Sequence, residues 1–174
     1  MTITPRFRKF ALTAHITSSV GWLGAVAGFL ALAVTGLTSQ DTQTVRGAYL
    51  AMEVITQFVI VPLCLTSLLT GLVQALGTKW GLFRHYWILI KFLITIISTI
   101  VLFVHLQPIN YLAGVAAETT LSSSDLQMQI QLIVAPGAAL LALLVATTLA
   151  VYKPRGMTPY GQRKQHEKRA ESQQ

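Results

Sequence analysis

Long apolar runs separated by short polar stretches dominate the chain. About twenty apolar residues, rising about 1.5 Å each, cross a hydrocarbon core of about 30 Å. The runs therefore predict four membrane spans, at about residues 10–37, 48–77, 86–107 and 129–152. We expect an all-α fold, a polytopic integral membrane four-helix bundle.

Prolines mark the places where these helices are expected to bend or stop. Pro62 lies inside the second run and Pro136 inside the fourth, where each removes a backbone donor and predicts a kink or an interruption. After Pro108 we expect irregular backbone as far as about Thr120. From residue 153 the chain turns polar and basic, so we divide it into a transmembrane domain, 1–152, and a tail, 153–174.

The composition supports a membrane location. Hydrophobic residues make up 53% of the chain and charged residues 11%, which is too apolar for an ordinary soluble domain. Eleven of the 13 lysines and arginines flank the spans on one side, Arg46 lies on the other, and Lys91 lies inside a span. By the positive-inside rule both termini are cytoplasmic. The expected location is a bacterial-type cytoplasmic (inner) membrane, with lipid rather than nucleic acid as the partner of the +7 net charge.

Polar residues form a stripe along the third span. Thr95, Ser98 and His105 follow Lys91 at offsets that fall on one side of a helix. Ionisable groups in lipid cost a few kcal/mol each, so the stripe is expected to face the bundle interior. The alternative is that Lys91 extends to the headgroups and His105 lies at the interface.

The topology predicts two polar levels. His15 and Lys91 each lie about five residues, or about 7 to 8 Å, inside the cytoplasmic ends of their spans, so they can meet. Glu53 and His105 share a depth near the opposite surface and can also meet. His15 and His105 are too far apart to ligate one iron within a single subunit.

Two short motifs resemble known membrane families. His15, Trp22 and Gly24 resemble the first helix of the copper-resistance D membrane family and of the oxygen-independent, haem-binding protoporphyrinogen oxidases. Trp87 and Lys91 are similar to a Trp-x3-Lys motif at the start of a later helix in the oxidases. The resemblance implies a b-type haem and essential roles for His15 and Lys91.

A haem site around His15 makes chemical sense. A neutral imidazole ligates iron through one nitrogen while Ser18, Ser19 or a backbone carbonyl holds the other. Trp22 would pack on the porphyrin, and Lys91, next to Trp87, would pair with a propionate. The alternative is a histidine bonded to a neighbouring helix, with Trp22 as ordinary packing.

The candidate metal ligands are His15, His105 and Glu53. The last two would form a second axial site, a proton relay, an outer metal site or a single interhelical hydrogen bond. A homodimer would supply a second haem ligand.

The sequence thus predicts a protein that binds b-type haem for electron transfer or for redox chemistry linked to porphyrin or quinol, and possible membrane oxidoreductase activity on a quinone or porphyrin substrate. Copper handling or transport, and a cofactor-free membrane assembly subunit, are the alternatives.

Overall fold

The chain folds into a bundle of long helices. The computed structural model describes residues 4–77, 83–118, 125–154 and 156–171, and these ranges contain no β-strand, only an isolated bridge between His85 and Met157. The helices are α1 (Pro5–Thr38), α2 (Thr42–Ile55), the π-helix η1 (Thr56–Ile60), α3 (Val61–Gly77), α4 (Tyr86–Glu118), α5 (Leu126–Tyr152) and α6 (Pro159–Glu171). The predicted all-α fold class is confirmed.

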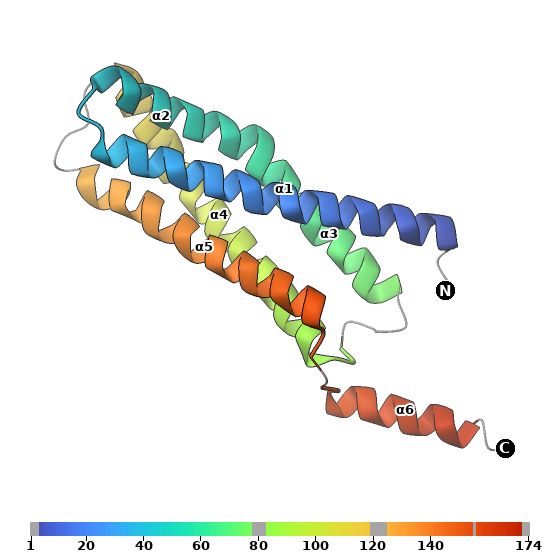
Figure 1. The fold of residues 1–174 in the computed structure, drawn as a ribbon. Helices are drawn as coiled ribbons and strands as arrows, with labels where there is room; N and C mark the ends of the chain where they lie inside the picture. The colour runs from blue at the N-terminus through green and yellow to red at the C-terminus, as the bar shows by residue number, and fades with distance from the viewer. Residues whose placement is uncertain (1–3, 78–82, 119–124, 155, 172–174) are drawn as a thin grey trace.

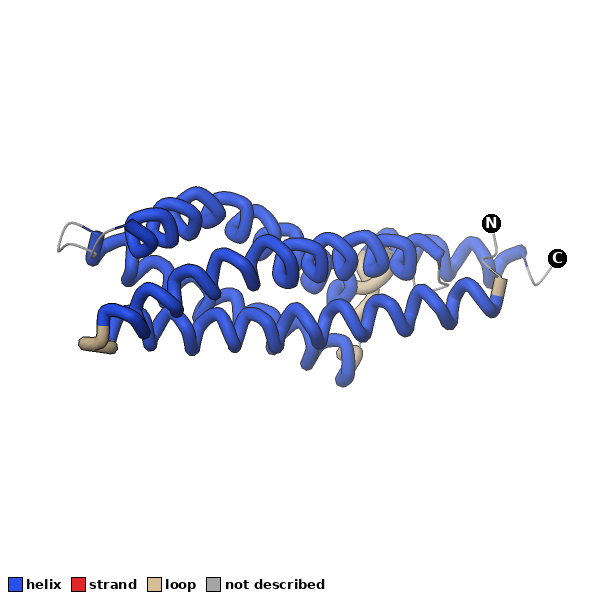
Figure 2. The backbone as a smooth tube through the Cα atoms, turned by 90° about the horizontal axis from the view of Figure 1, so that it is seen from above, coloured by secondary structure: helices blue, strands red, loops and turns tan. Residues whose placement is uncertain are grey.

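Four antiparallel segments make up the bundle: α1, the continuous α2–η1–α3, α4 and α5 (Figure 1). Each of the four is long and apolar enough to cross a membrane. Both chain termini lie at one end of the bundle, which we call the terminal end. The end of α1, the start of α2, the end of α4 and the start of α5 lie at the other end, which we call the turn end. Figure 2 shows the four segments running along a common direction.

These segments are longer than a bilayer requires. The segments α1, α2–η1–α3 and α4 contain 34, 36 and 33 residues, or about 50 Å each at about 1.5 Å per residue. A hydrocarbon core measures about 30 Å. Each helix would therefore cross with a tilt or project beyond the core.

The prediction that the chain becomes irregular after Pro108 is wrong, since α4 continues to Glu118. Pro136 likewise lies inside an uninterrupted α5. In water an internal proline costs about 3 kcal/mol. In lipid, irregular backbone would leave several polar groups unpaired, which costs more, so the helix persists.

Pro62, unlike Pro108 and Pro136, is preceded by a change in helix type. The turn before it widens into the π-helix η1, in which the Val61 N–H bonds the carbonyl of Thr56. A proline cannot donate a backbone hydrogen bond and crowds the carbonyl four residues earlier, so a wider turn relieves both problems. The Thr56 hydroxyl donates to the Met52 carbonyl at 2.6 Å and adds to the local hydrogen bonding.

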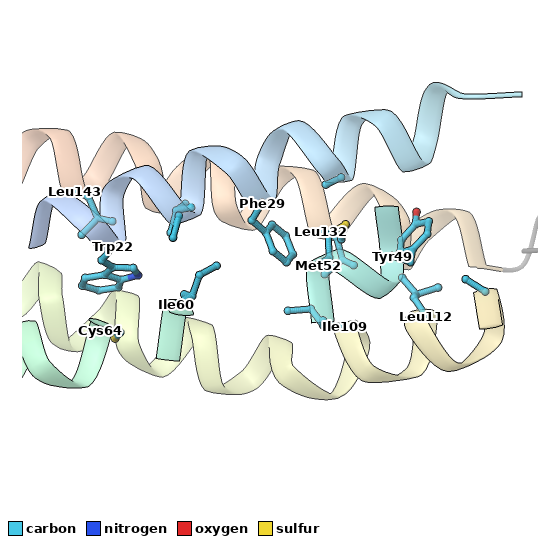
Figure 3. Packing of buried hydrophobic residues seen from close by; sticks show 14 residues of the cluster. Trp22, Phe29, Tyr49, Met52, Ile60, Cys64, Ile109, Leu112, Leu132 and Leu143 are labelled. Atoms are coloured by element: carbon cyan, nitrogen blue, oxygen red, sulfur yellow. The ribbon is translucent and has the colours of Figure 1, made fainter. Parts of the chain in front are cut away.

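The buried core runs along the bundle axis (Figure 3). Toward the turn end, Met52 and Leu112 have exposed fractions of 0%, and Tyr49 and Leu132 are almost as buried. Trp22 lies at the opposite end of the cluster, next to Ile60 and Cys64 in Figure 3. Fully buried side chains thus occur at both ends of the cluster, since Cys64 is also 0% exposed.

The tail contains a separate helix, α6, beyond the terminal end. Lys153 ends α5 with a left-handed backbone, φ 44°, and Pro154 follows it. Thr158 caps α6 by accepting from the Gly161 N–H at 3.1 Å, while its own N–H donates to the Arg84 carbonyl at 3.0 Å. A Cβ on Gly161 would lie 2.5 Å from the same carbonyl oxygen, so only glycine permits this approach. The tail is thereby fixed to the start of α4.

Candidate functional site at the terminal end

His15 points from α1 onto α3. Its Nδ1 lies 3.1 Å from the Ser67 carbonyl oxygen and 3.1 Å from Thr70 Oγ1. A carbonyl oxygen only accepts, so Nδ1 carries the proton and Nε2 keeps a free lone pair. Gly71 provides the room, because a Cβ there would lie 3.0 Å from the Cε1 atom of His15. The imidazole is therefore held in one tautomer, with Nε2 available as a ligand.

Further hydrogen bonds join α1 to α3 around this histidine. Ser19 Oγ lies 2.7 Å from Ser67 Oγ, and the Gln74 amide donates to the Ala11 carbonyl at 3.0 Å. Ser18 donates to the carbonyl of His15 itself at 3.1 Å. Of the three partners considered for the second imidazole nitrogen, a backbone carbonyl holds it, and the two serines make other bonds.

Lys91 and Trp87 lie together at the start of α4. The Lys91 ammonium sits 5.5 Å from the centre of the Trp87 ring, a cation–π contact across one helical turn. Lys91 is partly buried and close enough to His15 and Lys153 for their charges to interact. The sequence prediction placed His15 and Lys91 at one level, and the structure brings them near each other.

Trp22 belongs to a different site. It is 2% exposed and lines a cavity of about 50 Å³ in the centre of the bundle, together with Phe29, Thr56, Ser98 and His105. His15 is not among the residues that line this cavity. Trp22 and His15 thus share α1 but face different surroundings.

Glu53 and His105 are not joined in the described part of the chain by a hydrogen bond or an ion pair. His105 Nδ1 bonds the Val101 carbonyl of its own helix at 2.8 Å. The Glu53 carboxylate accepts from Gln57 at 3.4 Å, and Gln57 also donates to Asn110 at 3.2 Å. His105 lies 13 residues before the end of α4, well inside the helix rather than at its end.

His15, His105 and Glu53 do not form one metal site. Among the described residues, no group of three or more His, Cys, Asp or Glu side chains lies close enough to hold a metal ion. Copper handling therefore gains no support from these residues and stays a prediction.

The sequence placed Ser67 and Gly71 on an inward-facing polar stripe of the second span but did not assign that stripe to His15. Ser67, Thr70 and Gly71 lie within five residues of one another, with the two hydroxyls three apart on one helical face. That spacing predicts a polar face on an otherwise apolar helix. The partner of that face depends on how α1 and α3 are rotated against each other, which the sequence does not give.

Comparison with known proteins adds no relative. The chain matches no protein-family model, no curated protein and no solved structure. The resemblance carried by His15, Trp22, Trp87 and Lys91 therefore stays a prediction.

Proposed function

We propose that this is an integral membrane protein that binds b-type haem at the terminal end of its bundle, with His15 as an axial ligand. The bound haem supplies one-electron redox chemistry, and the protein takes part in electron transfer or in redox chemistry on a porphyrin or quinol. Attachment is non-covalent, because the chain contains one cysteine and no Cys-x-x-Cys-His motif.

The observation that carries the proposal is the state of the His15 imidazole. Histidines that ligate metals almost always donate their second N–H to a carbonyl or carboxylate, which fixes the tautomer and raises ligand basicity. The bond from Nδ1 to the Ser67 carbonyl meets this requirement. Gly71 leaves the ring unobstructed on one side. The chain's own contribution is a pre-oriented neutral imidazole.

Lys91 supports the same proposal through its charge. Among the described residues, no carboxylate forms an ion pair with Lys91. A partly buried ammonium near His15 suits a haem propionate, and the Trp87 ring holds its side chain in place. The second axial ligand would come from another copy of the chain or from a small molecule.

Orientation follows from the flanking charges. Along the sequence, eleven of the 13 lysines and arginines flank the spans on the side of the chain termini, so we assign the terminal end to the cytoplasm. Cysteine labelling tests this assignment, because Cys64 is buried and gives little background. A cysteine at Ser123 should react with an impermeant reagent applied from outside, and one at Gln165 should not. The reverse pattern would overturn the topology.

The haem proposal is tested by the absorbance spectrum of the detergent-purified protein. The wild type should show a Soret band, and His15→Ala should lose or strongly shift it. His105→Ala is the matched control, since it removes an imidazole from the same bundle and should keep the band. A folded, monodisperse His15→Ala with a full, unshifted spectrum would exclude His15 as the ligand.

Lys91→Met tests the propionate contact separately. Removing the cation should weaken haem retention by about 2 to 5 kcal/mol, by analogy with truncated buried charge pairs. Lys153→Met is the control, because Lys153 also carries charge near this end but is exposed. Equal haem affinity in the wild type and Lys91→Met would leave Lys91 as a lysine that reaches the headgroups.

A further inference from the structure

The central cavity contains polar groups that the haem proposal does not use. Its wall is mostly apolar, with Phe29 and Leu132 among the larger side chains, and the small residues 135–139 of α5 contribute Ala135, Pro136 and Ala139. Trp22, Ser98 and His105 also line it. Two of these three are almost fully buried, Trp22 at 2% and Ser98 at 7% exposed.

Each of these three side chains has a polar atom without a protein partner in the described residues. The His105 Nδ1 atom donates to the Val101 carbonyl, so Nε2 is an unprotonated acceptor with no bond of its own. The Ser98 hydroxyl and the Trp22 indole N–H likewise have no hydrogen bond among those residues. Figure 3 shows the indole nitrogen on the side of the ring that faces Phe29 and Ile60.

The unpaired atoms belong to residues that line a common cavity. Among the described residues no completely enclosed side-chain nitrogen or oxygen lacks a hydrogen-bond partner. The unpaired atoms of Trp22, Ser98 and His105 are thus not completely enclosed, and the cavity is a space that all three residues line. An unpaired buried polar group costs about 1 to 3 kcal/mol, so a polar occupant is favoured.

We propose that this cavity binds an internal cluster of water molecules that hydrogen-bonds Trp22 Nε1, Ser98 Oγ and His105 Nε2. A water needs about 10 to 15 Å³ of such volume, and a cavity of about 50 Å³ holds about three or four. Ser98 and His105 lie seven residues apart, about 10.5 Å along the helix, so about two or three waters at ordinary hydrogen-bond spacing bridge them. The Thr56 hydroxyl, which donates to Met52, still accepts a bond from this cluster.

The chemistry of the three groups suits water. The indole N–H only donates, the neutral Nε2 only accepts, and the serine hydroxyl does both. A chain of waters matches this alternation, with one end accepting from Trp22 and the other donating to His105. A purely apolar occupant would leave all three unpaired. The proposal is independent of haem, because His15 does not line the cavity.

Crystals under xenon pressure distinguish a hydrated cavity from a dry one, since dry apolar cavities take up xenon. In crystals of the full chain under xenon pressure, the wild type should show water density at the three polar atoms and no xenon. The double variant Ser98→Ala/His105→Leu should show the opposite. Thr147→Val removes a hydroxyl outside the cavity and should behave as the wild type. Xenon, lipid density or an empty cavity in the wild type would overturn the proposal.

Nuclear magnetic resonance gives a second test, which does not require the double variant to fold. The indole proton of Trp22, assigned from the spectrum of Trp22→Phe, should show a magnetisation-transfer peak to water in detergent-solubilised wild type. Absence of that peak, with the protein folded, would contradict an internal water at Trp22.

Discussion

At the turn end of the bundle, Tyr49, Met52 and Leu112 pack into a core with almost no exposed surface. At the terminal end, α1 and α3 are joined by hydrogen bonds from His15, Ser19 and Gln74. Apolar contacts are non-directional, so the turn end does not orient particular polar atoms. Hydrogen bonds are directional, so the terminal end orients the atoms that form them. The comparison indicates that the turn end stabilises the fold and the terminal end orients the candidate ligand.

The largest expected effect is at the turn end. Leu112→Ala should lower the free energy of unfolding by about 2 to 5 kcal/mol, because it leaves a cavity around a side chain that was 0% exposed. Leu93→Ala, on the same helix but 55% exposed, is the matched control and should change it little. Denaturant or thermal unfolding in detergent measures both. Equal losses would show that the turn end is not the stabilising region.

Alanine substitutions at two glycines, one at each end of the bundle, allow a direct comparison of the two ends. A Cβ on Gly36 would lie 2.9 Å from the ring of Tyr49, and one on Gly71 would lie 3.0 Å from the ring of His15. Alanine gains about 1 kcal/mol in helix propensity, but overpacking a fixed ring costs about 1 to 3 kcal/mol. Gly36→Ala should therefore destabilise the protein. Gly71→Ala should leave stability nearly unchanged, since His15 is less buried and can shift, and should displace the Soret band.

Unfolding curves and absorbance spectra of both glycine variants check this pair. A stable Gly36→Ala beside a strongly destabilised Gly71→Ala would reverse the assignment of roles to the two ends.

Removing one interhelical hydrogen bond at the terminal end should have a smaller effect. Ser67→Ala deletes the hydroxyl that meets Ser19, and such bonds in membrane proteins average about 0.6 kcal/mol. The Ser67 carbonyl remains and continues to hold His15. Ser18→Ala is the control, because its hydroxyl bonds only its own helix. A loss above about 2 kcal/mol in Ser67→Ala would mean that this end also supports the fold.

The smallest expected effect concerns the α1–α2 connection. The Thr44 hydroxyl and its N–H bond Asp41 and lower the pKa of that carboxyl below its ordinary value of 3.8. The bonds therefore stabilise the fold above about pH 4 and are lost as the pH falls through the lowered pKa. Asp41→Ala should remove this pH dependence and Asp41→Asn should keep the helix cap. Identical acid unfolding of wild type and Asp41→Ala would contradict it.

The sequence predicted the four apolar helices because their hydrophobic runs exceed the thickness of a bilayer. The predicted helix end at Pro108 and the predicted interruption at Pro136 were wrong. Proline breaks helices in water, but these segments have no water to hydrogen-bond a broken backbone, so the helices continue. That error also placed His105 too near a helix end. The longer α4 puts this histidine inside the bundle, against the central cavity.

The site was predictable only in part. Depth along the helices brought His15 and Lys91 to one level, because rise per residue is nearly constant. The partners of His15 on α3, and the separation of Trp22 from it, depend on helix rotation and on packing between distant segments. The attachment of Thr158 and Gly161 to residues 83 and 84 joins positions about 75 residues apart, and no local sequence pattern predicts it.

The central claim is that His15 Nε2 ligates haem iron, and chemical rescue tests it most directly. His15→Gly should leave the fold intact, abolish the Soret band of the purified protein, and regain it when imidazole is added to haem-supplied protein. A folded His15→Gly that keeps the wild-type Soret band without imidazole would contradict the claim.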